Sequence, residues 1–350
     1  MKLDFGCLKC GLIGAVVAAV LLSPSTPAQV HAAGASFPYP VFSRWADGYR
    51  RETGAGVNYQ SIGSGAGIRQ VKARSVVFGA SEQPLRPEEL DAADLIQWPQ
   101  IVGGVVPVVN LDGVAAGEIV LDGETLARIF LGDIGRWDDP AIRRLNPRVA
   151  LSAQPIIVVH RSESSGTTFT LSNYLAKLSP EWRARVGESN ALSWPIGVGA
   201  KGNEGVANYV ARTRGALGYV EYAYAKQNRL SFTRMINRDH AIVSPSAAAF
   251  RSALEHADWA SAPAFYQILT DQAGADSWPI VAATFILLPK RPRDMALALE
   301  AVKFFDWAFA SGGSTAEALD YTPLAPALVA LIRKKWSENL LIADAAPAQK

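Results

Sequence analysis

The chain has 350 residues, of which 49% are apolar and 19% are charged. This composition is typical of a well-packed protein with one large or two smaller domains, and it excludes an intrinsically disordered chain. A formal net charge of +2 excludes the large basic fields of nucleic-acid-binding proteins and the basic tails of membrane-surface proteins.

The N-terminal segment predicts export. Residues 11–22 form an apolar run that is shorter than the roughly 20 residues needed to cross a bilayer. The run has the length of a signal-peptide core, roughly 7–15 residues. Because Val30 and Ala32 are small residues at the third and first positions before a cut, we predict a signal peptide over residues 1–32, cleaved after Ala32, with Ala33 as second choice. The alternative is an uncleaved anchor.

Both cysteines lie in this N-terminal segment. Cys7 and Cys10 precede the apolar run, whereas a lipoprotein signal places its cysteine after that run. The predicted cut leaves the mature protein without cysteine, so it needs no disulfide chemistry in an oxidising compartment.

The rest of the chain alternates short apolar strands with amphipathic helices, which predicts an α/β fold with parallel or mixed sheets. The first predicted helix ends near Gly54, because glycine is a frequent helix stop. In chain order we predict a helix at 41–52, strands at 57–59 and 105–110, a helix at 125–131, strands at 156–159 and 285–288, and a helix at 295–310.

Two apolar segments, residues 101–110 and 278–288, are candidates for strands that cross between two lobes. With these crossings, lobe I is discontinuous and consists of residues 33–109 and 284–350. Lobe II is the block 110–283. A ligand cleft would then lie between the lobes, at the carboxyl ends of strands, where α/β folds bind their ligands.

Three glycine-containing turns, at residues 33–38, 63–67 and 164–168, each carry hydroxyl side chains and precede a predicted helix. Glycine lets the backbone approach a ligand, and a helix N-terminus offers free N–H groups and a partial positive charge. A single such turn is explained as well by ordinary N-capping. Three in one chain favour an anion-binding site.

Charged residues beside these turns refine the chemistry. Arg161 precedes the third turn, and its guanidinium matches an oxyanion in bidentate geometry, with Glu163 placed to orient it. Glu82 is an acidic residue near the predicted anion site. A carboxylate is favourable there if the bound anion carries a proton that the carboxylate can accept. Phosphate near neutral pH keeps an O–H that needs an acceptor, whereas sulfate has none and a carboxylate would repel it.

At these residues the sequence resembles the periplasmic phosphate-binding proteins of Pst-type ABC phosphate importers. The resemblance extends over nearly the whole mature chain. It is carried by residues 34–38, 58–64, 78–81, 101–106, 121–123, 136–139, 145–147, 161 with 165–167, 194–197, 215–223, 278–280 and 304–307.

The resemblance implies a two-lobed periplasmic-binding-protein fold, type II-like, with mixed sheets flanked by helices and two crossing strands as the hinge. It implies that phosphate is buried between the lobes, with Glu82 as the acceptor and Glu163 orienting Arg161. The implied phosphate ligands are Ser36, Phe37 through its N–H, Ser64, Glu82, Arg161, Ser165, Gly166 and Thr167.

The sequence departs from the commonest family pattern at four positions. Both acids, Glu82 and Glu163, replace aspartates, and each adds one methylene. Ser36 replaces a commoner threonine and Ala66 a commoner glycine. We hypothesise that the two longer acids compensate for each other through a slightly wider cleft.

The resemblance further implies a monomer that delivers phosphate to the membrane permease of an ABC importer and also accepts arsenate, without cofactor, metal or nucleic acid. One alternative is a binding protein for another oxyanion, such as sulfate or molybdate. A second is a secreted phosphatase or serine hydrolase that uses Ser165 with His160, although His160 should point away from Arg161 in a strand. A third is a surface adhesin or signalling protein with the same fold.

Overall fold

The computed structural model describes residues 29–340, and a mixed sheet runs through this part of the chain. Its strands are ordered β2-β1-β3-β12-β4-β8-β6-β7, with β9 beside β4, and β5, β10 and β11 form a second, small sheet. The strands are β1 Gln29–Gly34, β2 Gly56–Ser61, β3 Phe78–Ser81, β4 Leu95–Val109, β5 Val120–Leu121, β6 Ile157–Arg161, β7 Val198–Ala200, β8 Ala216–Glu221, β9 Ser231–Phe232, β10 Arg234–Ile236, β11 Ile242–Val243 and β12 Val281–Pro289.

The strand directions confirm the predicted α/β class with mixed sheets. β1 is parallel to β2 and β3, and β6 is parallel to β7 and β8. β12 is antiparallel to both of its neighbours, β3 and β4. Parallel strands at both ends of the sheet are therefore joined through an antiparallel centre.

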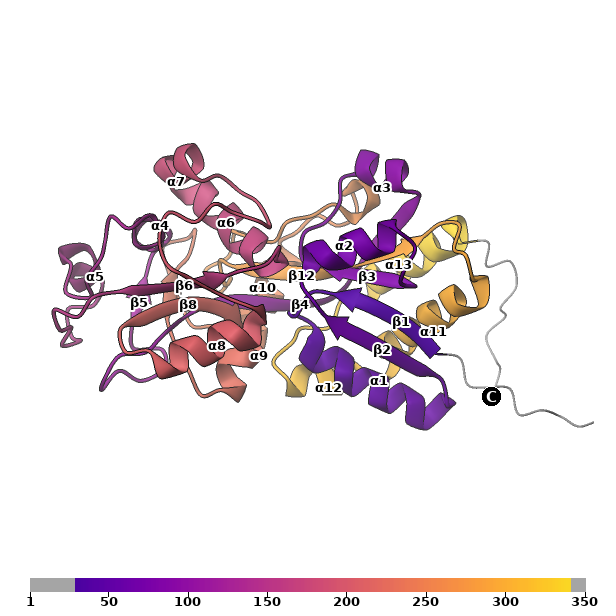
Figure 1. Cartoon of the computed structure of the whole chain (residues 1–350), viewed down its shortest axis with the longest axis horizontal. Helices are drawn as coiled ribbons and strands as arrows, with labels where there is room; N and C mark the ends of the chain where they lie inside the picture. Colours follow the sequence, from indigo (N-terminus) through magenta and orange to yellow (C-terminus); the bar gives the residue numbers. More distant parts are fainter. Residues whose placement is uncertain (1–28, 341–350) are drawn as a thin grey trace, which may run out of the picture.

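β4 extends further than predicted and crosses the centre of the molecule. Residues 95–104 pair with β12, and residues 105–109 pair with β8. Fourteen of its fifteen residues are buried, in keeping with a strand that is covered on both faces. Figure 1 shows β4 and β12 between two groups of elements. The predicted lobe boundaries at 109/110 and 283/284 stay a prediction.

Helices cover both groups of strands. Figure 1 places α1, α2, α3, α11, α12 and α13 with β1–β3, here called the β1–β3 side, and α4–α9 with β6 and β8, the β6–β8 side. The helices are α1 Tyr39–Thr53, α2 Ser64–Lys72, α3 Pro87–Ala93, α4 Gly123–Leu131, α5 Pro140–Leu145, α6 Gly166–Leu178, α7 Pro180–Arg185, α8 Gly202–Arg212, α9 Tyr222–Gln227, α10 Ala247–Glu255, α11 Met295–Ser311, α12 Gly313–Ala318 and α13 Pro326–Asn339.

α1 shows how the sequence pattern produces a helix of this kind. Val41, Phe42, Trp45 and Tyr49 recur at helical spacing, and all four side chains are buried. The helix ends at Gly54 with a φ of 78°, a left-handed conformation that glycine adopts without strain, as predicted. Since this helix follows the first turn directly, its packing fixes the direction of the turn's N–H groups.

β1 overlaps the predicted signal-peptide cut. A cut after Ala32 would remove four of the six residues of β1, which lies between β2 and β3 in the sheet. Val30 and Ala32 are buried there, so the loss of this stretch would open the core. The predicted cut after Ala32, or after Ala33, falls inside this central strand, and the cut site stays a prediction. Residues 1–28 of the predicted signal peptide lie outside the described residues.

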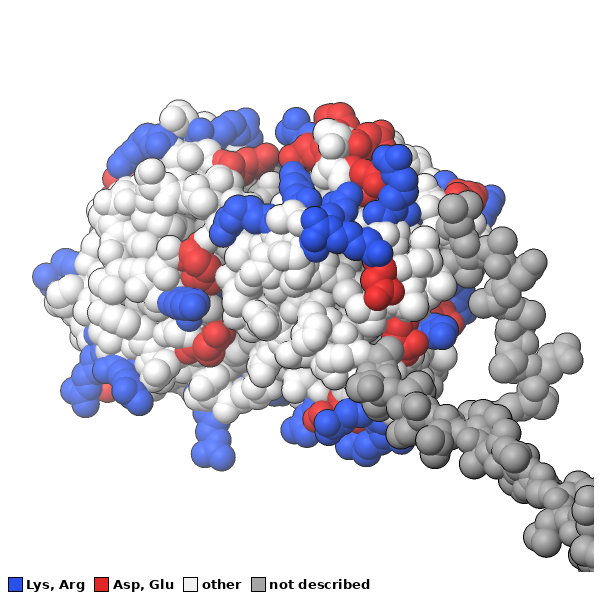
Figure 2. Space-filling model, turned by 45° about the vertical axis from the view of Figure 1, so that its right-hand side comes forward, with Lys and Arg blue, Asp and Glu red and all other residues white. Residues whose placement is uncertain are grey.

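The surface shows no field of a single sign on the face seen in Figure 2, where acidic and basic side chains lie close to one another around a broad uncharged area. Ion pairs such as Arg185 with Asp133 and Lys290 with Asp91 join side chains of opposite charge on the surface. Within residues 29–340, none of the helices combines the length and the apolar character needed to cross a membrane.

Candidate anion-binding site

The three predicted turns meet at the centre of the molecule, where α1, α2 and α6 begin. The Gly63 N–H donates to the Gly34 carbonyl at 2.9 Å, which joins the first two turns. The Gly65 N–H donates to the Ser164 carbonyl at 3.2 Å, and the Gly166 N–H donates to the Ser64 hydroxyl at 2.9 Å. The second and third turns therefore touch across the boundary between the β1–β3 and β6–β8 sides.

The polar side chains predicted for this place are almost completely buried. Ser64, Ser165 and Thr167 are 0% exposed, and Ser36, Glu82 and Arg161 are no more than 3% exposed. Burying polar and charged groups without partners costs several kcal/mol in total, so the contacts among these groups determine whether the cluster is tolerated.

Arg161, at the end of β6, is held by Glu163 and Thr167. Its Nε donates to Glu163 Oε1 at 2.9 Å and its Nη2 contacts the same oxygen, while Nη1 donates to Thr167 Oγ1 at 3.1 Å. The Gly202 N–H also donates to Glu163 Oε1, at 3.1 Å. Glu163 Oε2 is buried with no hydrogen-bond partner in the described part of the chain. The three bonds leave two of the five guanidinium N–H groups for an anion.

Glu82 follows β3 and faces the same cluster. Its Oε2 accepts from the Ser64 hydroxyl at 3.1 Å and its Oε1 accepts from the Thr284 hydroxyl at 3.3 Å. Burial raises the pKa of the Glu82 carboxyl to about 7, although these hydrogen bonds and the charge of Arg161 act in the opposite direction. Near neutral pH this carboxyl is poised between accepting and donating a proton.

Asn203 belongs to this cluster and was missed by the sequence analysis. It lies in the first turn of α8, is 0% exposed, and donates through Nδ2 to Ser36 Oγ at 2.9 Å. A signal was present, because Gly202 and Asn203 form a fourth glycine turn between a strand and a helix. Asn203 escaped notice because hydroxyl residues defined the other three turns.

Two tyrosines hold the backbone of the first turn. The Tyr224 hydroxyl donates to the Ser36 carbonyl at 2.7 Å, and the Tyr321 hydroxyl donates to the Phe37 carbonyl at 2.6 Å. These bonds satisfy carbonyls beside the helix start, and they orient the peptide units around residue 37, including the N–H predicted as a ligand.

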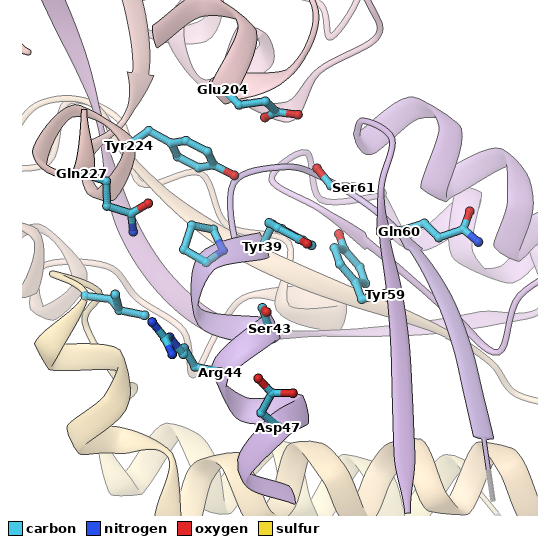
Figure 3. Close-up of a pocket in the computed structure, with 12 residues that line it drawn as sticks. Tyr39, Ser43, Arg44, Asp47, Tyr59, Gln60, Ser61, Glu204, Tyr224 and Gln227 are labelled. Atoms are coloured by element: carbon cyan, nitrogen blue, oxygen red, sulfur yellow. The ribbon is translucent and has the colours of Figure 1, made fainter. Parts of the chain in front are cut away.

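A groove of about 870 Å³ adjoins this turn, between α1 and β2 on one side and α8 and α9 on the other. Figure 3 shows Tyr39 and Tyr59 facing the groove opposite Tyr224 and Glu204. None of the predicted ligand residues lines it. Tyr59 connects it with the first turn by donating to the Ala35 carbonyl at 2.7 Å.

The catalytic alternative finds no support at His160. Its ring stacks on Trp194 with centroids 4.7 Å apart, and its Nδ1 contacts the Arg161 carbonyl at 3.0 Å. Ser165 uses its hydroxyl to accept the Thr168 N–H at 3.2 Å, as an N-cap of α6. Over residues 29–340, no group of three or more His, Cys, Asp or Glu side chains is placed to hold a metal ion.

A mixed sheet divided by two crossing strands, with helix N-termini converging on a buried arginine between its halves, defines a solute-binding protein for an anion. Comparison with known protein families agrees, because residues 23–311 match the model of the PBP superfamily domain.

Similar proteins specify the family. The phosphate-binding protein PstS of Pasteurella multocida (strain Pm70) is 47% identical over 94% of this chain and 97% of its own length. The PstS protein of Haemophilus influenzae is also 47% identical, over 89% of this chain and 93% of its own. The chain therefore belongs to the PstS family of phosphate-binding proteins, and it is a solute-binding protein rather than an enzyme.

Solved structures share the fold at lower identity. A high affinity periplasmic phosphate-binding protein bound with phosphate superposes with a TM-score of 0.70 at 22% identity, covering 87% of this chain and 93% of that one. A phosphate-binding protein from Stenotrophomonas maltophilia gives a TM-score of 0.65 at 20% identity, with the same coverage. These likenesses confirm the predicted periplasmic-binding-protein architecture.

Proposed function

We propose that this protein captures inorganic phosphate at the junction of the three turns and delivers it to the membrane permease of an ABC importer. The observation that supports this proposal best is the combination of a buried Arg161 with a buried carboxyl of raised pKa, Glu82, that faces the same cluster. The relatives are named as phosphate-binding proteins, which favours the same ligand here.

In this proposal the donors surround the anion and one group accepts from it. Arg161 binds with its two remaining N–H groups, and backbone N–H groups at the helix starts share the negative charge. Glu82 accepts the proton that phosphate retains. The proposed ligands are Ser36, Phe37 through its N–H, Ser64, Glu82, Arg161, Ser165, Gly166 and Thr167, with Glu163 orienting the arginine.

Hinge closure is the proposed mechanism of capture. Lobe I (33–109 and 284–350) and lobe II (110–283) would rotate about β4 and β12, and phosphate would stabilise the closed state by contacting both lobes. Direct bonds between turns 63–67 and 164–168 correspond to such a closed arrangement. We expect the closed form, as a monomer, to dock on the permease.

Selectivity follows from the protonation of the ligand. Ionised Glu82 accepts from phosphate or arsenate, both of which carry a proton near neutral pH, and repels sulfate, which carries none. Arsenate is therefore the expected second ligand, and sulfate is expected not to bind.

Export requires a cut that spares β1. We place it after Ala28, where Thr26 and Ala28 are the small residues at the third and first positions before the cut, so that Gln29 becomes the first residue. The mature protein would then be periplasmic with β1 intact. N-terminal sequencing of the exported protein checks this, and a start at Ala33 would contradict it.

Isothermal titration of ligand-free mature protein at pH 8 with phosphate, arsenate and sulfate tests the proposed function. We expect tight one-to-one binding of phosphate and arsenate and no heat with sulfate. Arg161→Lys keeps the positive charge but loses the bidentate geometry of the guanidinium, so the phosphate affinity of this variant should fall roughly tenfold to hundredfold. No binding of any oxyanion by the wild type would refute the proposal. Turnover of a phosphomonoester would revive the catalytic alternative.

A further inference from the structure

Asn203 has a defined orientation inside the site. Its Oδ1 accepts the Glu221 N–H at 2.9 Å, so the amide nitrogen must be the group that faces the first and third turns. Nδ2 lies 2.9 Å from Ser36 Oγ and 3.4 Å from Thr167 Oγ1. Since an amide nitrogen carries two hydrogens, Asn203 supplies one donor to a hydroxyl from each side of the molecule.

These donors occupy the acceptor capacity of the two hydroxyls. Ser36 Oγ accepts from Asn203 Nδ2 and also from the Asn203 backbone N–H, at 3.2 Å. Thr167 Oγ1 accepts from Asn203 Nδ2 and from Arg161 Nη1, at 3.1 Å. A hydroxyl has two lone pairs and one hydrogen. With both lone pairs engaged, each hydroxyl can only donate its own hydrogen to a ligand.

We propose that Asn203 is a positioning residue that commits the hydroxyls of Ser36 and Thr167 to donation, so that neither hydroxyl accepts a proton from the ligand. The inference rests on the proposed phosphate function. Its consequence is discrimination against the phosphate monoanion at these two hydroxyls, because a second proton placed there would meet a hydroxyl that has no free lone pair. Without Asn203 Nδ2, either hydroxyl can turn and accept that proton.

Other titratable groups face this network and are the same in wild type and variants. They come from β6 and the turn after it, from α8, β8 and α9, and from the segment after α12: Arg161, Glu163, Glu204, Glu221, Tyr224 and Tyr321. Glu82, whose pKa is raised by burial to about 7, faces the same cluster from the turn after β3 and is also present in wild type and variants. A comparison of wild type with an Asn203 variant therefore holds these groups constant and changes only the amide.

The experiment measures proton release on phosphate binding by titration calorimetry at pH 6, in buffers with different ionisation enthalpies. In Asn203→Ala we expect about one proton fewer to be released per phosphate than in wild type, and a phosphate affinity that falls about tenfold at pH 8 but less at pH 6. In the Ser36→Ala background the change at Asn203 should have a smaller effect, because one of its targets is gone.

Asn203→Asp keeps the size of the side chain and the acceptor for the Glu221 N–H, but it replaces the Nδ2 donor by an oxygen. Ser36 should then donate to the introduced carboxylate instead of the ligand, and phosphate affinity at pH 8 should fall more than a hundredfold with little change in melting temperature. Wild-type proton release in Asn203→Ala, with an equal loss of affinity at both pH values, would overturn the inference. Absence of phosphate binding in the wild type would instead refute the proposed function.

Discussion

The Glu82 carboxylate and the Ser64 hydroxyl are joined by a 3.1 Å hydrogen bond, although 18 residues separate them in the chain. The same hydroxyl accepts the Gly166 N–H at 2.9 Å, from the other side of the molecule. Ser64 therefore links the acid of the site to the first residue of α6. A ligand that displaces one of these bonds must replace it, which makes the geometry here sensitive to small changes.

Gly166→Ala should disturb this link directly. A Cβ at Gly166 would lie 2.6 Å from Ser64 Oγ and would clash with Glu82 Oε2. Because both neighbours belong to the proposed site, we expect phosphate affinity to fall roughly tenfold to hundredfold, with a stability loss of about 1–3 kcal/mol. Titration calorimetry and urea unfolding measure the two effects.

Gly135→Ala is the matched control, since no heavy atom beyond the adjoining residues lies within 4 Å of a Cβ at that position. Its phosphate affinity should equal that of the wild type. If Gly166→Ala also bound phosphate with wild-type affinity, the anion could not lie between Glu82, Ser64 and the start of α6.

The pKa of Glu82 predicts a pH-dependent stability of the ligand-free protein. Burial raises this pKa from 4.5 to about 7, so between these values the folded state keeps a proton that the unfolded state has released. Stability should therefore fall as pH rises through this window and level off above it, with a loss of about 3 kcal/mol from this group. Glu82→Gln should lack this part of the decline.

Urea unfolding at pH 4.5 to 8, in phosphate-free buffer, measures the difference between the two proteins. Glu221 is also buried with a raised pKa and acts in the same direction, but it is present in both, so it cancels in the comparison. Parallel stability curves for wild type and Glu82→Gln would show that Glu82 has the same pKa in the folded and unfolded states.

Sulfate rejection should weaken as pH falls. Below about pH 7 Glu82 becomes protonated and can donate to sulfate instead of repelling it. We expect sulfate affinity to be lowest at pH 8, to strengthen roughly tenfold between pH 8 and pH 6, and to level off below pH 6, where Glu82 is almost fully protonated. Glu82→Gln, whose amide donates at every pH, should bind sulfate equally at pH 6 and 8. Sulfate rejection by this variant would mean that another group discriminates between the anions.

The elements around the site could be predicted because their signals are local. Gly54 ends α1 where a left-handed residue is needed, and the glycine and hydroxyl residues at 63–67 and 164–168 mark the starts of α2 and α6. Such signals depend on the backbone conformation of a few neighbouring residues. They do not depend on the rest of the fold.

What could not be predicted from the sequence depends on long-range packing. β1 begins at Gln29, since its pairing with β2 and β3 buries Val30 and Ala32, yet the same small residues also match a signal-peptidase site. Asn203 joins the cluster through bonds to Ser36 and Glu221, which are 167 and 18 residues away in the chain. The Gly202–Asn203 turn marks the start of a helix, but no local pattern encodes which distant groups Asn203 contacts.

The two glutamates at the acid positions provide the last test. Glu163 uses Oε1 for Arg161 and Gly202 while its Oε2 has no partner among the described residues, and Glu82 uses both oxygens. Shortening Glu163 alone would withdraw Oε1 from both donors by about the length of one C–C bond, roughly 1.5 Å. Shortening Glu82 alone would withdraw its carboxylate from Ser64 in the same way.

If the longer acids compensate for each other through a wider cleft, Glu82→Asp and Glu163→Asp should each weaken phosphate binding roughly tenfold. The double variant should lose less than the sum of the two, because the sides can then close by the missing distance. A double-mutant cycle measured by titration calorimetry gives the coupling. Binding by the double variant that is more than tenfold tighter than wild type would show that the glutamates weaken the site and do not compensate for each other.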